Sequence, residues 1–154
     1  GEMLSQICHA DYHGNNVLYD DDMKVVAVLD WDNAGLAEPY VDFVQTFITN
    51  VINKRYDTYQ TERKENADVF VQGYVEGVGE RFDIERLKDA YYILMHERIG
   101  TPWPMNQHYF YGNKNDDARL QPLLDRSVAF AGHHKEILDF ILEAVNKVNT
   151  DYGS

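Results

Sequence analysis

One short stretch decides the fold, and it runs Ile7-Cys8-His9-Ala10-Asp11-Tyr12-His13-Gly14-Asn15-Asn16-Val17-Leu18-Tyr19, followed by Val28-Leu29-Asp30-Trp31-Asp32. Its apolar runs at 17–20 and 24–29 flank an acidic turn, which is typical of a β-hairpin. A hairpin returns the chain on itself, so it would carry Asp30 back beside Asn16. The spacing therefore predicts that polar side chains from two separate segments meet at one site.

These residues suit the transfer of a phosphoryl group. That chemistry needs a group that accepts or orients the attacking hydroxyl, and a divalent metal that neutralises the phosphates. Asp11 fits the first role, because a carboxylate can accept the proton of a hydroxyl. The amide of Asn16 and the carboxylate of Asp30 offer the hard oxygen ligands that Mg²⁺ prefers. The pattern His-x-Asp-x₄-Asn followed by a strand-ending aspartate is a specific signal for this chemistry.

The remainder of the chain predicts about five helices. Glu38-Pro39 opens the first, and apolar residues then recur at helical spacing as far as Ile52. Further helices are expected over 61–78, from the cap Asp83 to 99, over 116–130 and over 134–148, with Gly132 separating the last two. Residues 101–115 are expected to form a loop. The prediction is one domain over 1–154 of α+β class, mostly α-helical, with a short β-hairpin before the helices.

Composition excludes several classes of partner. The net charge of −12 over 154 residues argues against a nucleic-acid partner, whose phosphates require a basic surface. No apolar run approaches the length of a membrane span, so no membrane association is expected. The single cysteine is typical of a reducing, cytoplasmic environment. An acidic protein is compatible with a cationic small-molecule substrate, since acidic clefts concentrate cations.

The segment from residue 9 to residue 43 resembles the aminoglycoside phosphotransferase and choline kinase-like family, whose fold is related to that of protein kinases. The resemblance rests on His9-Ala10-Asp11-Tyr12-His13-Gly14-Asn15-Asn16-Val17-Leu18, on Leu29-Asp30-Trp31-Asp32 and on Glu38-Pro39-Tyr40-Val41-Asp42-Phe43. It implies that Asp11 is the catalytic base, and that Asn16 and Asp30 bind Mg²⁺ and through it the phosphoryl donor, ATP or GTP. It also implies that His9 and Asp42 support the catalytic loop.

The departures from the family pattern are mild. Ala10 and Asn15 replace glycines, Gly14 stands where proline is common, and Glu38 replaces an aspartate. Asn15 is expected to tolerate a left-handed backbone better than most residues. None of these changes removes a group that the chemistry needs, so the catalytic half of the site is expected to be intact.

Four further residues are candidates for contact with substrate or phosphate. His13 either makes such a contact or stabilises the loop by a hydrogen bond. Asp32 either supports the metal and substrate or is a solvated loop carboxylate. Trp103 and Tyr109 belong to an aromatic loop whose rings either hold a cationic acceptor through cation–π contact or pack the loop onto the core.

The same resemblance predicts that a part of the enzyme is absent from this sequence. Kinases of this type carry a phosphate-covering glycine loop and a strand lysine on an N-terminal nucleotide-binding lobe. The sequence has no G-x-G-x-x-G and no lysine in a suitable strand. The expectation is therefore the C-terminal lobe of a protein kinase-like fold, taken from an ATP-dependent phosphotransferase. Its acceptor is a hydroxyl of a small molecule, with a cationic, aminoglycoside-like compound as one option. Without its N-terminal lobe as partner, this fragment is expected to be inactive.

Two alternative functions stay open at this point. One is a non-catalytic remnant of a kinase-like protein that acts as a binding module. The other is a metallohydrolase that uses His9, Asp11 and His13, because alternate residues of an extended segment share one face. The second alternative leaves the hairpin and Asp30 unexplained.

Overall fold

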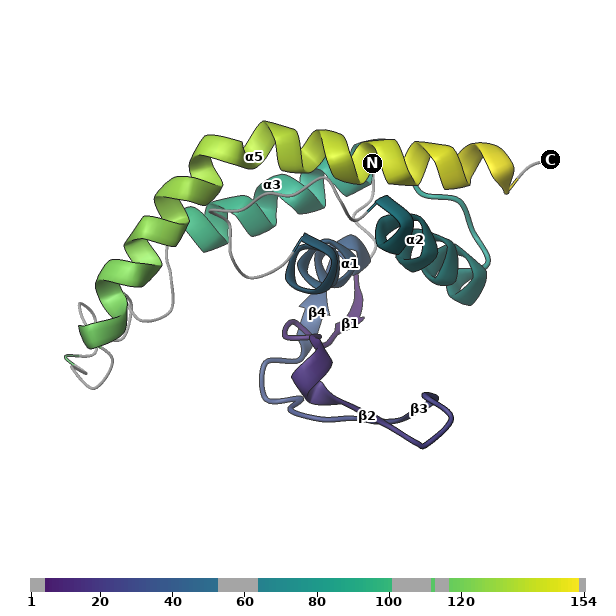
Figure 1. The fold of residues 1–154 in the computed structure, drawn as a ribbon, viewed down its shortest axis with the longest axis horizontal. Helices are drawn as coiled ribbons and strands as arrows, with labels where there is room; N and C mark the ends of the chain where they lie inside the picture. Colours follow the sequence, from purple (N-terminus) through teal and green to yellow (C-terminus); the bar gives the residue numbers. More distant parts are fainter. Residues whose placement is uncertain (1–4, 53–63, 101–111, 113–116, 153–154) are drawn as a thin grey trace.

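The computed structural model describes residues 5–52, 64–100, 112 and 117–152, and Figure 1 shows their arrangement. The described chain is mostly helical, with two small antiparallel sheets of two strands each, as the α+β prediction requires. In chain order its elements are β1 (Gln6–Cys8), η1 (Gly14–Asn16), β2 (Val17–Tyr19), β3 (Val25–Val28), β4 (Gly35–Ala37), α1 (Pro39–Thr46), η2 (Phe47–Ile52), α2 (Lys64–Val78), α3 (Ile84–Gly100) and α5 (Asp117–Asp151).

The predicted hairpin is confirmed as the pair β2 and β3. Val17 lies opposite Val28, and the antiparallel register places Leu18 opposite Ala27. The turn between the strands is held by Asp20, whose Oδ1 accepts the backbone N–H of Asp22 at 3.0 Å and of Lys24 at 2.9 Å. Short acidic side chains stabilise turns in this way. The hairpin therefore forms where the sequence places its acidic turn.

A second small sheet pairs β1 with β4, and the sequence did not predict it. Ile7 lies opposite Leu36 in an antiparallel register that joins three residues of each strand. Strands this short show too few alternations for a hydrophobic period to be recognised. The pairing has a consequence for the site: β1 leads into the loop that begins at His9, and β4 leads into α1, so the loop and the helix start side by side.

Helix α1 lies at the centre of the molecule, with the other helices on one side and the strands on the other (Figure 1). Pro39 occupies its first turn, where the missing N–H costs nothing. Its apolar face is buried against α3 and α2, and Phe43 packs at 4.6 Å from Phe82 and 5.5 Å from Phe70 between ring centroids. The opposite, polar face is left for the loop and the strands.

Two helix ends are set by capping residues, and one of these, Asp83, is the cap that the sequence predicts. Asp83 Oδ1 accepts the backbone N–H of Glu85 at 3.0 Å and of Arg86 at 3.2 Å at the start of α3, as expected of an N-cap. Gly79, with a φ of 77°, donates its N–H to the carbonyl of Val75 at 2.8 Å and closes α2. Two predicted segments lie outside the described residues. They are residues 61–63, expected at the start of α2, and the expected loop 101–115, of which only Gly112 is described.

The prediction that Gly132 separates two helices is wrong. Helix α5 is continuous from Asp117 to Asp151 and contains Gly132 and Pro122. A glycine inside a helix costs only about 1 kcal/mol relative to alanine. Phe130 on one side of Gly132 and Ile137 and Ile141 on the other are all buried in the core, which outweighs that cost. Figure 1 shows the helix bent along its length rather than broken.

None of the helices in the described part of the chain combines the length and the apolar character that crossing a membrane requires.

Candidate active site

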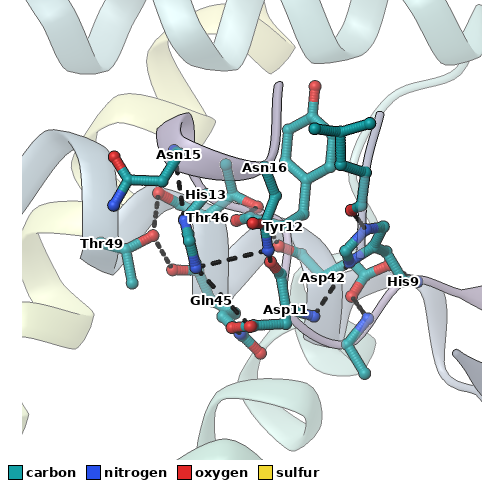
Figure 2. Close-up of polar contacts among 12 residues, drawn as sticks. His9, Asp11, Tyr12, His13, Asn15, Asn16, Asp42, Gln45, Thr46 and Thr49 are labelled. Carbon is teal, nitrogen blue, oxygen red and sulfur yellow. Dashed lines mark hydrogen bonds and ion pairs between the residues drawn. The ribbon is translucent and has the colours of Figure 1, made fainter. Parts of the chain in front are cut away.

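The loop that carries Asp11 is fixed to α1 through one carboxylate. Asp42, in the first turn of α1, accepts the backbone N–H of His9 on Oδ2 at 2.6 Å and that of Ala10 on Oδ1 at 2.8 Å. Charge-assisted bonds of this kind are roughly twice as strong as neutral ones. Both N–H groups precede Asp11 directly, so Asp42 determines where the chain enters the loop (Figure 2).

His9 links the same loop to the end of β3. Its ring is buried, with 4% of the residue exposed. The N–H of Asp11 donates to Nδ1 at 3.2 Å, so the ring proton lies on Nε2, which donates to the carbonyl of Leu29 at 2.8 Å. Trp31 packs against the ring at 4.7 Å between centroids. His9 thus holds Asp11 and the segment before Asp30 at a fixed separation.

Asp11 is partly exposed, and two polar side chains face its carboxylate. The ring Nε2 of His13 lies 3.6 Å from Oδ2, and the amide of Gln45 donates to Oδ1 at 3.4 Å. The side chain keeps 35% of its accessible surface. A carboxylate oriented in this way and open to solvent can accept a proton from a hydroxyl that approaches from outside.

Asn16 connects the Asp11 loop to the hairpin. Its side-chain Nδ2 donates to the backbone carbonyl of Asp11 at 3.0 Å, and its own carbonyl accepts the N–H of Leu29 at 2.8 Å. The second bond continues the β2–β3 register by one pair, so Leu29 lies opposite Asn16, and Asp30 is the next residue along the chain. The bond to Asp11 directs the amide oxygen of Asn16 the other way, where it can serve as a ligand.

Two residues of the site have a left-handed backbone, Ala10 at φ 63° and Asp30 at φ 62°. This conformation is unfavourable for residues other than glycine, and such strain clusters at functional sites. The expectation that Asn15 tolerates a left-handed backbone is not needed, because Asn15 has no positive φ. Of the two residues that replace glycines of the family pattern, Ala10 has the strained left-handed backbone and Asn15 does not.

The remaining predicted residues are placed as follows. His13 lies inside the loop, where its Nδ1 accepts the N–H of Asn15 at 3.3 Å, so it makes a loop-stabilising bond in addition to facing Asp11. Asp32 is exposed beyond β3. Trp103 and Tyr109 lie outside the described residues.

The neighbouring thiol is not suited to nucleophilic chemistry. Cys8 is buried, and its Sγ lies 3.6 Å from the carbonyl of Ala37. Burial, and then the nearby charge of Asp42, raises the pKa of the Cys8 thiol. A raised pKa keeps the thiol protonated and unreactive at neutral pH. Cys8 is therefore not a candidate for the chemistry of this site.

The arrangement does not favour the metallohydrolase alternative. Both ring nitrogens of His9 are engaged by backbone groups, which leaves neither for a metal. Within the described ranges, no group of three or more histidine, cysteine, aspartate or glutamate side chains is placed to hold a metal ion. The oxygen pair offered by Asn16 and Asp30 suits a different metal, one that completes its shell with phosphate oxygens and water.

Sequence reasoning missed two residues of α1 that contact the loop. Gln45 and Thr46 are both 4% exposed, and Thr46 Oγ1 lies 3.1 Å from the carbonyl of Tyr12 and 2.7 Å from that of Asp42. The available signal was their position: polar residues three and four places after Asp42 share its face of the helix. In an otherwise apolar stretch, such residues indicate a buried polar contact.

Comparison with known proteins gives one match. The family model described as "Phosphotransferase enzyme family" matches residues 3–89, which includes the whole of the loop, the hairpin and α1. This agrees with the resemblance to aminoglycoside phosphotransferase-like proteins. No curated protein and no solved structure matches the chain.

Proposed function

The chain belongs to the phosphotransferase enzyme family, and on that premise we propose that it takes part in transferring a phosphoryl group from ATP or GTP to a hydroxyl of a small molecule. The observation that carries the proposal is the position of Asn16, which bonds to the Asp11 carbonyl with its side chain and to Leu29 with its backbone. Asn16 thereby links the loop of the proposed base to the residue that precedes Asp30, which supports the proposal of one shared site.

Asp11 is the proposed base. Its carboxylate is held near His13 and Gln45 but keeps an exposed side, from which an acceptor hydroxyl can approach. Asp11 orients this hydroxyl and takes its proton as the oxygen attacks phosphorus. His9 and Asp42 act indirectly, by fixing the backbone that leads into Asp11.

Asn16 and Asp30 are the proposed Mg²⁺ ligands. The donor set fits the ion, because an amide oxygen and a carboxylate are hard ligands and Mg²⁺ is commonly bound by one or two protein groups plus phosphates. When bound, the ion would neutralise phosphate charge. The left-handed backbone of Asp30 is consistent with a residue whose direction is fixed by function rather than by local preference.

The nucleotide is proposed to be held from the other side by an N-terminal lobe that this sequence does not contain. The exposed apolar side chains of the two small sheets support this. Ile7 and Leu36 of the β1–β4 sheet are 71% and 77% exposed, and Val26 of the hairpin is 61% exposed. Exposed apolar side chains that lie opposite each other, as Ile7 and Leu36 do across the β1–β4 pair, are typical of an interaction site. A lobe that covers it would complete the nucleotide site.

The acceptor is proposed to be a small hydroxyl compound, and a cationic one is favoured by charge. The chain carries 26 acidic against 14 basic residues, so its field attracts cations. Within the described residues, His13 and Asp32 are the proposed contacts with the acceptor. Trp103 and Tyr109 of the aromatic loop remain further proposed contacts.

Manganese binding tests the metal site in this chain alone. Mn²⁺ replaces Mg²⁺ at oxygen sites and broadens the NMR signals of nearby nuclei. We expect broadening centred on Asn16 and Asp30, and its loss in Asp30→Asn. The matched control is Asp21→Asn, in the exposed hairpin turn, which should leave the broadening unchanged. Broadening spread evenly over the acidic surface would contradict the site.

Phosphoryl transfer is tested in the natural gene product that contains these 154 residues. Hydroxyl compounds, cationic ones included, are screened for phosphate transfer from labelled ATP and GTP. A phosphorylated product is expected, and Asp11→Asn should lower kcat by about 10²–10⁴-fold, the usual contribution of a positioned base. Unchanged turnover in Asp11→Asn would remove this residue from the mechanism.

A further inference from the structure

The polar face of α1 runs alongside the catalytic loop and contacts successive loop residues in order. Asp42 bonds to the N–H groups of His9 and Ala10, Gln45 to the side chain of Asp11, and Thr46 to the carbonyl of Tyr12. Residues three and four places apart lie on one face of a helix, which explains how all three reach the loop. Of these contacts, only the one from Gln45 is made to the carboxylate of Asp11 itself.

Gln45 is a buried polar residue at the boundary between the core and the site. It is 4% exposed, and its neighbours Val44 and Phe47 are fully buried in the core. An amide is taken out of water only at a cost unless it is hydrogen-bonded. The Gln45 Nε2 donates to Asp11 Oδ1 at 3.4 Å, and Figure 2 shows the side chain lying beside that carboxylate.

We propose that Gln45 is a positioning residue for Asp11, an inference that rests on the proposed function. Its amide holds Oδ1 on the side of α1, and His13 lies 3.6 Å from Oδ2, so the carboxylate is bracketed and its rotation is restricted. The exposed side of the group then keeps one orientation toward the acceptor. Gln45 touches neither acceptor nor phosphate and acts through Asp11 alone.

The chemistry of an amide suits this task. A lysine at the same place would form an ion pair and reduce the basicity of Asp11, whereas an apolar residue would give the carboxylate no fixed partner. A neutral donor orients the carboxylate while leaving its charge for the proton transfer. The bond is 3.4 Å long, and hydrogen bonds of catalytic groups commonly tighten in the complex with substrate.

The contact itself is tested in this chain by NMR, without any assay of activity. The side-chain NH₂ signals of Gln45 should shift on Asp11→Asn, because the acceptor changes from a carboxylate to an amide. The matched control is the NH₂ group of Gln72 on α2, which donates to Glu76 at 2.8 Å and should not respond. Gln45 signals that stay in place on Asp11→Asn would overturn the inference.

The positioning role is tested by kinetics in the active natural gene product. Gln45→Met keeps the volume of the side chain and removes the donor, and we expect kcat to fall roughly tenfold with KM nearly unchanged. In the Asp11→Asn background the same substitution should have no further effect on kcat. Gln45→Asn, which keeps the amide on a shorter arm, should recover part of the rate. Gln72→Met is the control and should leave both constants unchanged.

The outcomes separate the two proposals. An equal loss of kcat from Gln45→Met in both backgrounds would show a general structural effect and overturn the inference. A rise of KM with unchanged kcat would also overturn it. If Gln45 responds to Asp11→Asn by NMR but no hydroxyl compound is phosphorylated, the contact exists but the proposed function fails. The positioning role of Gln45 in that function then fails with it.

Discussion

Asp42 and His9 are joined by a 2.6 Å hydrogen bond from the backbone N–H of His9 to Oδ2 of Asp42, across 33 positions of sequence. The other oxygen of Asp42 takes the N–H of Ala10 at 2.8 Å. A single side chain on α1 therefore fixes two consecutive peptide groups of the loop. This relationship ties the orientation of Asp11 to the packing of α1 in the core, because any shift of the helix would move the loop with it.

Asp42→Asn should weaken this link and the fold together. The amide has one acceptor in place of two, so one of the two N–H groups would face an NH₂ donor. We expect the free energy of unfolding to fall by about 1–3 kcal/mol, the usual cost of leaving a buried polar group without its partner. Urea denaturation followed by circular dichroism measures the change. Asp139→Asn, at an exposed position of α5, is the control, and an equal effect there would contradict the prediction.

Ala10→Gly should stabilise the protein. The φ of 63° gives Ala10 a left-handed backbone conformation, which costs about 1–2 kcal/mol for a residue with a Cβ. Glycine removes that strain but loses about 0.5–1 kcal/mol through the entropy of the unfolded chain. A net gain of about 0.5–1 kcal/mol in the free energy of unfolding is therefore expected.

The control for Ala10→Gly is Ala131→Gly, inside α5. There the backbone is helical, so only the entropic loss applies and the protein should be destabilised by about 1 kcal/mol. Opposite signs at the two positions, measured by urea denaturation, are the expected result. Destabilisation at both would show that the left-handed backbone at Ala10 does not dominate.

Local signals predicted much of the fold, because several elements here begin and end at residues with a strong local preference. The hairpin follows from two apolar runs around Asp20, and Pro39, Asp83 and Gly79 mark helix ends by their own chemistry. The prediction failed at Gly132, where the local preference for a break is weaker than the burial of apolar residues on both sides. It also missed the β1–β4 pairing, which only tertiary contacts stabilise.

The residues of the candidate site likewise differ in whether a local pattern in the sequence marks them. Asp11, Asn16 and Asp30 were proposed from the sequence, because their spacing along the chain carries the signal. Gln45 was not, because its partner Asp11 lies 34 positions away and a single glutamine in an apolar helix has no pattern. Contacts between the loop and α1 depend on how the helix packs, and no local rule specifies that packing.

The protein should lose stability in alkaline solution, in part through Tyr74. Burial, and then the nearby Tyr40, raises the pKa of Tyr74 to about 12. In the unfolded chain tyrosine titrates near pH 10. Between about pH 10 and 12 the unfolded state therefore releases a proton that the folded state keeps, and the free energy of unfolding falls as the pH rises.

Tyr74→Phe should make this fall shallower, because phenylalanine has no proton to release. Part of the slope should remain, since burial also raises the pKa values of Tyr12 and Tyr40. Tyr152→Phe, at a residue that is 46% exposed, is the control and should leave the slope unchanged. Urea denaturation at several pH values between 8 and 11 gives the comparison. Identical slopes for Tyr74→Phe and the unsubstituted protein would refute the assignment.

Arg86 should be required for the junction between α3 and the start of α1. Its Nη2 donates to Glu38 Oε1 at 2.6 Å and its Nε to Oε2 at 3.4 Å, while its guanidinium lies 5.0 Å from the centre of the Tyr40 ring. The Glu38 side chain is only 8% exposed, and Arg86 is its ion-pair partner. Lysine cannot present two donors in a fork or stack on the ring in the same way.

Arg86→Lys should therefore behave as a non-conservative change and lower the free energy of unfolding by about 1–2 kcal/mol. Arg86→Met should lower it by about 2 kcal/mol or more, because this change leaves the Glu38 carboxylate unpaired. Adding Glu38→Gln to Arg86→Met should recover part of the loss, since the unpaired charge is removed. Urea denaturation of Arg86→Met, of Glu38→Gln and of the double variant measures the coupling between the two residues. If the losses of Arg86→Met and Glu38→Gln simply add in the double variant, the two residues are not coupled.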